Sequence, residues 1–102
     1  MKYQLVLQFP ASSAKDFDQL IEVEEELMKS LGSEHIVDGH DFGSGEMNLF
    51  IHTNDPINAF EKARKYLAPG HEQHLVAAYR DLKGNKYTVL WPKGYGKEFR
   101  VI

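Results

Sequence analysis

The sequence predicts a single α+β domain in which two helices cover one face of an antiparallel sheet. Three observations lead to this prediction. The chain has 102 residues, which is about the size of one domain. Five short segments have the pattern of strands, and two longer segments repeat apolar residues every three or four positions. Their order along the chain is strand, helix, strand, strand, helix, strand, strand.

The first strand is expected over residues 3–9, because the side chains alternate between two faces there. One face carries Tyr3, Leu5, Leu7 and Phe9. The other face carries Gln4, Val6 and Gln8. Pro10 is expected to end the strand, since proline has no N–H to donate to a sheet.

The first helix is expected to begin at a capping box, Ser13 to Asp16, and to run to about Leu31. Gly32 is available there as a left-handed C-terminal residue. The predicted apolar stripe consists of Phe17, Leu20, Ile21, Leu27, Met28 and Leu31.

The second helix is expected to begin at Asp55 and Pro56, an acidic cap followed by a proline suited to the first turn. It should run to about Leu67, with Pro69 and Gly70 ending it. The predicted apolar face consists of Ile57, Phe60, Ala63 and Leu67.

Two β-hairpins complete the prediction. Residues 35–53 should form two strands around Gly43-Ser44-Gly45, although Gly39 interrupts the first of them. Residues 75–82 and 86–91 should form the second hairpin around residues 83–85. The apolar residues of the final segment predict that it packs back on the domain: Phe99, Val101 and Ile102.

The first six elements resemble the ferredoxin-like α+β superfamily, a βαββαβ sandwich, over nearly the whole chain. A further C-terminal strand would extend the sheet at one edge. Residues 38–46, with 48–51 after them, also resemble short bacterial proteins of no assigned function. The resemblance implies one ferredoxin-like domain over residues 1–102. It implies no activity, because the superfamily includes enzymes, sensors, nucleic-acid binders and assembly modules.

The composition argues against several classes of protein. The chain has no cysteine, which removes disulfides, thiolate metal sites and cysteine nucleophiles. Its net charge of −3 argues against nonspecific binding to nucleic acid or anionic membranes. The basic, glycine-containing motif of RNA-recognition modules is also missing. No signal-peptide core and no apolar run of ~20 residues is present, so a cytoplasmic protein is expected.

The densest polar cluster lies in the first hairpin and consists of Asp38, His40, Asp41, Ser44 and Glu46. Carboxylates and imidazoles are ligands for divalent metals. The spacing fits no strong metal or nucleotide motif, so we expect turn chemistry and no tight metal. His71 and His74 follow the second helix, and we expect them to lie in a loop and not in a metal site.

Glu24 is anomalous because it falls in the middle of the apolar stripe of the first helix. A carboxylate in a core is costly unless it is paired or protonated. Three alternatives remain open: the side chain reaches water, forms a structural ion pair, or is functional. We expect it to be buried with a basic or hydroxyl partner, and Arg64 is the predicted partner.

The sheet face without helices should carry Gln4, Val6, Gln8, Asn48, Phe50 and His52. This face has little charge and one aromatic residue, which is the composition of an interface core. We therefore expect a homodimer, or contact with another protein, through this face.

The sequence favours a non-catalytic binding or protein-interaction domain that self-associates and needs no cofactor. One alternative is a small enzyme of the dimeric α+β barrel type. Its pocket between sheets would hold a small molecule and be lined by Asn48, His52, Tyr79 and Trp91. Another alternative is a metal- or anion-binding sensor that uses the loop at residues 38–46.

Overall fold

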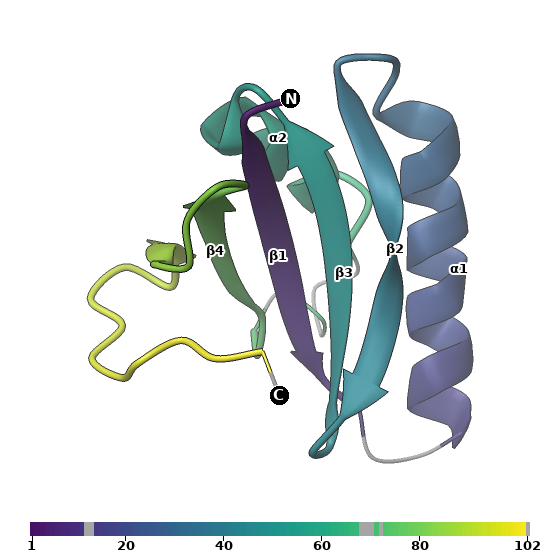
Figure 1. The fold of residues 1–102 in the computed structure, drawn as a ribbon. Coiled ribbons are helices and arrows are strands. Elements are labelled where there is room, and N and C mark those ends of the chain that lie inside the picture. The colour runs from purple at the N-terminus through teal and green to yellow at the C-terminus, as the bar shows by residue number, and fades with distance from the viewer. Residues whose placement is uncertain (12–13, 68–70, 72, 102) are drawn as a thin grey trace.

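The computed structural model describes residues 1–11, 14–67, 71 and 73–101. It is an α+β fold with five strands and two helices (Figure 1). The strands are β1 (Tyr3–Pro10), β2 (His35–Gly43), β3 (Glu46–Thr53), β4 (Val76–Asp81) and β5 (Thr88–Trp91). The helices are α1 (Ala14–Ser30) and α2 (Pro56–Arg64). The strands form one sheet in the order β2-β3-β1-β4-β5, and every neighbouring pair is antiparallel. This arrangement is compatible with a ferredoxin-like fold.

The main core lies between the sheet and the two helices. The predicted alternation of β1 is confirmed, because Leu5, Leu7 and Phe9 are buried in this core. β3 contributes Met47, Leu49 and Ile51 in the same way. α1 packs on β2 and β3, whereas α2 packs on β1 and β3. The two helices therefore cover different parts of one sheet face.

Two residues of the predicted helix stripes are exposed. Met28 and Ile57 are each 57% exposed. In α1 the buried apolar residues are Leu20, Val23 and Leu27, and Met28 lies about 100° round the helix from Leu27. In α2 the buried residues are Pro56, Ala59, Phe60 and Ala63, a spacing that likewise turns Ile57 outward. The predicted capping residue of α1, Ser13, and the predicted end of α2 at residues 69–70 lie outside the described residues.

The first hairpin is tighter than predicted. Only Ser44 and Gly45 form its turn, and both have positive φ, 51° and 77°. The residues expected in a loop, Asp38, His40 and Asp41, instead belong to β2. Gly39 does not end this strand, because it lies at a β-bulge with φ 138°.

The opposite sheet face is partly covered by the chain itself. A second apolar cluster joins Val6 and Ala78 of the sheet to Phe99 of the C-terminal segment, with Tyr95 and Val101 packed against it. This segment, residues 92–101, is called the tail below; it is the yellow strand-free stretch of Figure 1. The prediction that the final segment packs back is confirmed for its described residues, Phe99 and Val101.

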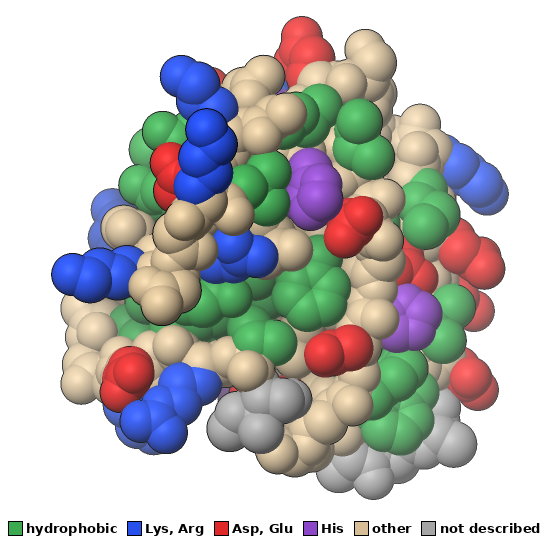
Figure 2. Space-filling view, viewed as in Figure 1, with side chains coloured by type: hydrophobic (Ala, Val, Ile, Leu, Met, Phe, Trp, Pro, Cys, Tyr) green, Lys and Arg blue, Asp and Glu red, His purple; other side chains and the backbone are tan. Residues whose placement is uncertain are grey.

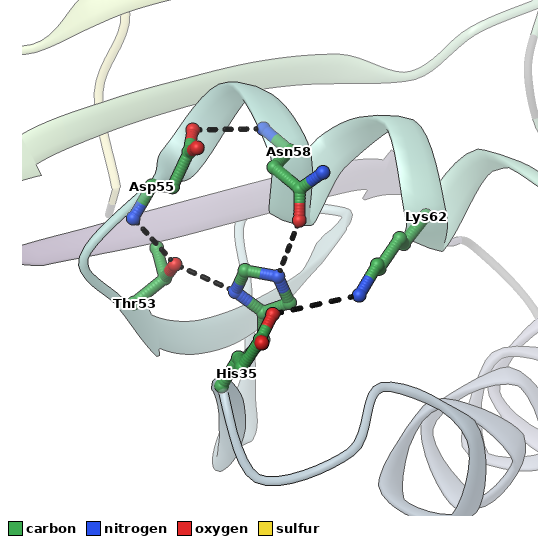
Figure 3. A network of polar contacts seen from close by, with 6 residues as sticks. His35, Thr53, Asp55, Asn58 and Lys62 are labelled. Atoms are coloured by element: carbon green, nitrogen blue, oxygen red, sulfur yellow. Dashed lines mark hydrogen bonds and ion pairs between the residues drawn. The ribbon is translucent and has the colours of Figure 1, made fainter.

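A polar network fixes α2 against the ends of β2 and β3 (Figure 3). His35 is 3% exposed, and its Nδ1 lies 2.7 Å from Thr53 Oγ1. Its Nε2 lies 2.9 Å from Asn58 Oδ1. The N–H of Asp55 donates to Thr53 Oγ1, and the Asp55 carboxylate caps α2 by accepting from the N–H of Asn58. Since both ring nitrogens of His35 have partners, this histidine is part of the scaffold.

Candidate functional site

The polar cluster predicted at residues 38–46 is divided between the two faces of the sheet. His40 stands opposite Leu49 and faces α1, whereas Asp41 stands opposite Asn48 on the face that carries the tail. The two side chains therefore cannot converge on one ion. Among the described residues, no group of three or more histidine or acidic side chains is arranged to hold a metal.

Glu46 lies at the start of β3, beside the hairpin turn. It stands opposite Pro10 on one side and Gly43 on the other. Partial burial raises the pKa of the Glu46 carboxyl above its ordinary value, because burial disfavours the charged form.

Glu24 is buried, as predicted, with 6% of its surface exposed. Its two carboxylate oxygens lie 2.8 and 2.9 Å from Nδ1 of His40. The prediction of Arg64 as its partner is wrong. The Arg64 guanidinium instead lies over the rings of Trp91 and Phe60, 4.4 and 5.3 Å from their centroids. The reason is the helix placement: α1 lies over β2 and meets His40, whereas α2 lies over β1.

The Glu24–His40 pair holds the imidazole in a fixed orientation. Because a carboxylate only accepts hydrogen bonds, Nδ1 of His40 carries the proton and Nε2 is the free nitrogen when the ring is neutral. The ring packs edge-on against Phe42, which in turn contacts Phe17 of α1. His40 lies outside the main cleft described below. The pair therefore joins α1 to β2.

Most side chains predicted for the open sheet face are buried within the chain. Val6 and Asn48 are fully buried, and Gln4 and Gln8 are at most 9% exposed. Gln8 Nε2 donates to Asn48 Oδ1 at 3.0 Å and to the main-chain oxygen of Arg100 at 2.8 Å. The expectation that this whole face is open is wrong, because the tail covers its β1 and β4 side. Gln4 Oε1 accepts from Nε of Arg80 at 3.1 Å, and Asn48 Nδ2 donates to Asp41 Oδ1 at 3.1 Å. These buried amides therefore have partners within the chain.

The rest of this face remains uncovered beside the tail. We call it the β2–β3 patch, and it consists of Ile36, Asp38, Asp41, Phe50 and His52. Ile36 is 52% exposed, and Phe50 is half-buried. His52 Nε2 lies 3.6 Å from a carboxylate oxygen of Asp38. The patch combines an apolar centre with acidic side chains.

The four residues expected to line an enzyme pocket do not share a face. Tyr79 stands opposite Leu5, and Trp91 packs against the helix-side core. Asn48 and His52 stand opposite Gln8 and Gln4 on the other face. The sheet therefore separates the two pairs, and these four residues cannot line one pocket.

A cleft of about 720 Å³ lies between α1 and three residues that follow α2, namely Tyr66, His71 and His74. Its described apolar wall consists of Phe9, Pro10, Leu20, Val23 and Tyr66. Its polar wall consists of Asp16, Gln19, Glu22, Glu26, His71 and His74. His71 and His74 stand out in the sequence as a pair, but the cleft has no local sequence signal, because it joins α1 to residues more than 35 positions away along the chain.

Charge is unevenly distributed along the chain and across the sheet face that carries the tail, called the tail face below. Residues 16–46 contain ten acidic residues and one basic residue, Lys29. Residues 80–101 contain six basic and two acidic residues. Figure 2 views the molecule from the tail side, and most blue side chains lie on the left, the side of β4 and the tail. Red and purple side chains lie over β2 and β3 toward the right.

Comparison with known proteins finds no match for this chain among family models, curated proteins or solved structures. Neither helix of the described residues has the length and apolar character needed to cross a bilayer.

Proposed function

We propose that this chain is a ferredoxin-like, non-catalytic binding module that associates with a second copy of itself through its tail face. The observation that supports the proposal is the β2–β3 patch, where Ile36 is 52% exposed next to a half-buried Phe50. An apolar, aromatic centre with charged residues around it matches the pattern of a protein interface, in which a polar rim surrounds an apolar core.

Charge favours a second copy as the partner. The acidic part of the face lies on β2, at Asp38 and Asp41. The basic part lies on the tail, where Lys93, Lys97 and Arg100 are exposed. In a two-fold dimer whose axis runs parallel to the strands, the β2 side of each copy meets the tail side of the other. Such a dimer is self-complementary in charge, which favours correct encounter.

Pairing through the sheet edge fits the described residues less well. β2 is an edge strand, but it carries a bulge between Val37 and Gly39 and exposes Asp38 and Asp41. Bulges and charged side chains are features that prevent edge-to-edge pairing. The face is therefore a better surface for association than the edge.

Sedimentation equilibrium on wild type and Phe50→Glu tests the proposal. We expect the wild type to form dimers at micromolar concentration and Phe50→Glu to stay monomeric, because the variant buries a charge at the centre of the interface. Ile57→Glu is the control for placing a charge on an apolar surface residue, since Ile57 is 57% exposed and lies on α2, away from this face. A monomeric wild type contradicts the proposal, and a Phe50→Glu dimer as stable as wild type places the interface elsewhere.

A further inference from the structure

We infer that the cleft between α1 and the residues Tyr66, His71 and His74 binds a small organic cation with an apolar body, such as an arylalkylamine. The inference is independent of the proposed self-association, because the cleft lies on the helix side of the sheet. It begins from the size of the cleft, about 720 Å³. Pockets that hold small molecules commonly have volumes of ~300–1,000 Å³.

The apolar wall sets one half of the ligand chemistry. Phe9 is 1% exposed and packs edge-on against the His71 ring, with the two ring centroids 6.0 Å apart. Leu20 and Val23 present the same flank of α1, and Tyr66 stands 39% exposed near the other side. An aromatic or aliphatic body would cover these side chains, and an aromatic ring also offers a face to a nearby cation.

The charged wall sets the other half. Asp16, Glu22 and Glu26 line the cleft, and none of its described lining residues is a lysine or arginine. Such a wall attracts a cation and repels an anion. A metal ion is a poorer fit, because the described residues contain no group of three metal-ligating side chains. An ammonium group on an apolar body meets both walls at once.

His71 gives a separate indication that this wall is incomplete. Its Nδ1 is buried and has no hydrogen-bond partner among the described residues. A buried polar atom without a partner is uncommon and costs free energy. His71 also lines the cleft. A ligand that enters and lets this ring turn would supply a partner for this nitrogen.

Phenethylamine is the probe that tests the inference, and phenethyl alcohol and phenylacetate are its neutral and anionic counterparts. Backbone amide shifts in a two-dimensional NMR titration report both affinity and location. We expect saturable shifts around Val23, Tyr66 and His71 with phenethylamine, and a Kd in the millimolar range for so small a ligand. The alcohol should bind at least about fivefold more weakly, and phenylacetate should not bind, because each lacks the positive charge.

Variants locate the charge effect. Glu22→Gln combined with Glu26→Gln should weaken phenethylamine binding by about five- to tenfold, since two nearby charges are removed. Glu25→Gln is the matched control, because Glu25 is exposed on α1 but does not line the cleft. The inference is overturned if the alcohol binds as tightly as the amine, if the shifts map to another surface, or if no saturable shifts occur below ~20 mM. It is also overturned if the control weakens binding as much as the double variant.

Discussion

His40 holds the buried carboxylate of Glu24 through a single ring nitrogen, with Nδ1 2.8 Å from Oε1 and 2.9 Å from Oε2. The two residues come from α1 and β2, sixteen positions apart. Glu24 has 7% of its side chain exposed, and the His40 side chain has 30%. The contact therefore satisfies a polar group that the apolar stripe of α1 would otherwise leave without a partner.

His40→Ala should lower the free energy of unfolding by about 1–3 kcal/mol, because it leaves the buried Glu24 carboxylate without its partner. Urea unfolding measures the change. His52→Ala is the matched control. The His52 and Asp38 side chains are 31% and 54% exposed, and the distance from His52 Nε2 to Asp38 Oδ2 is 3.6 Å. The control should cost less than about 1 kcal/mol. If both variants lowered the free energy of unfolding equally, the contact between Glu24 and His40 would stabilise the fold no more than a surface ion pair does.

Glu46→Gln should raise stability at neutral pH, and the gain should disappear as the pH is lowered. Burial raises the folded-state pKa of Glu46 above its unfolded value. The native state therefore holds the proton to higher pH than the unfolded state does. Stability falls as the pH rises from the unfolded-state pKa through the folded-state pKa of Glu46. Below pH ~4 the carboxyl is protonated in both states, and the wild type should match the variant.

Thermal unfolding of wild type and Glu46→Gln across this pH range measures the effect. Glu61→Gln controls for the loss of an exposed carboxylate on α2. A stability difference between wild type and Glu46→Gln that is the same at pH ~4 and at neutrality would be inconsistent with a raised pKa.

Phe99→Ala should cost about 3 kcal/mol, because Phe99 is 6% exposed and covers Val6 and Ala78. Arg100→Ala is the matched control in the same segment. The Arg100 side chain is exposed and pairs with exposed Glu98, whereas its main-chain oxygen, which accepts from Gln8, is kept. The control should change stability by less than about 0.5 kcal/mol. A loss below 1 kcal/mol for Phe99→Ala would mean that the tail does not stabilise the sheet face.

The sequence predicts the elements of this fold well because periodicity is a local property. The alternation of β1 correctly separates Leu5 and Leu7 from Gln4 and Gln8. The helical period of α1 likewise places Glu24 in the buried stripe of that helix. Arg64 is the wrong partner for Glu24, because the position of a helix on a sheet depends on contacts between residues that are distant in the sequence.

One bulge accounts for the misplaced polar cluster. Strict alternation from Ile36 would put His40 on the tail face. The extra residue at Asp38 shifts the register, so His40 stands opposite Leu49 and faces α1. Gly39 is the residue in the sequence that indicates this irregularity, and it marks a bulge and not the end of a strand. The covering of Val6 and Gln8 by the tail had no comparable local signal, since it joins residues about 90 positions apart.

The proposed dimer sets the acidic β2 side of one copy against the basic tail side of the other. Exchanging a charge between these two sides tests the arrangement. Asp38→Lys and Lys97→Glu each place like charges across the two-fold contact, so each variant alone should dimerise more weakly than wild type. An equimolar mixture should recover a heterodimer, because both cross-contacts then join opposite charges.

Sedimentation equilibrium of the two variants, alone and mixed, is the decisive measurement. We expect two weakened homodimers and a mixture whose dimer is about as stable as wild type at low salt, with the recovery reduced at high salt. A mixture that remains as dissociated as the separate variants, or a wild type that is monomeric throughout, would contradict this arrangement.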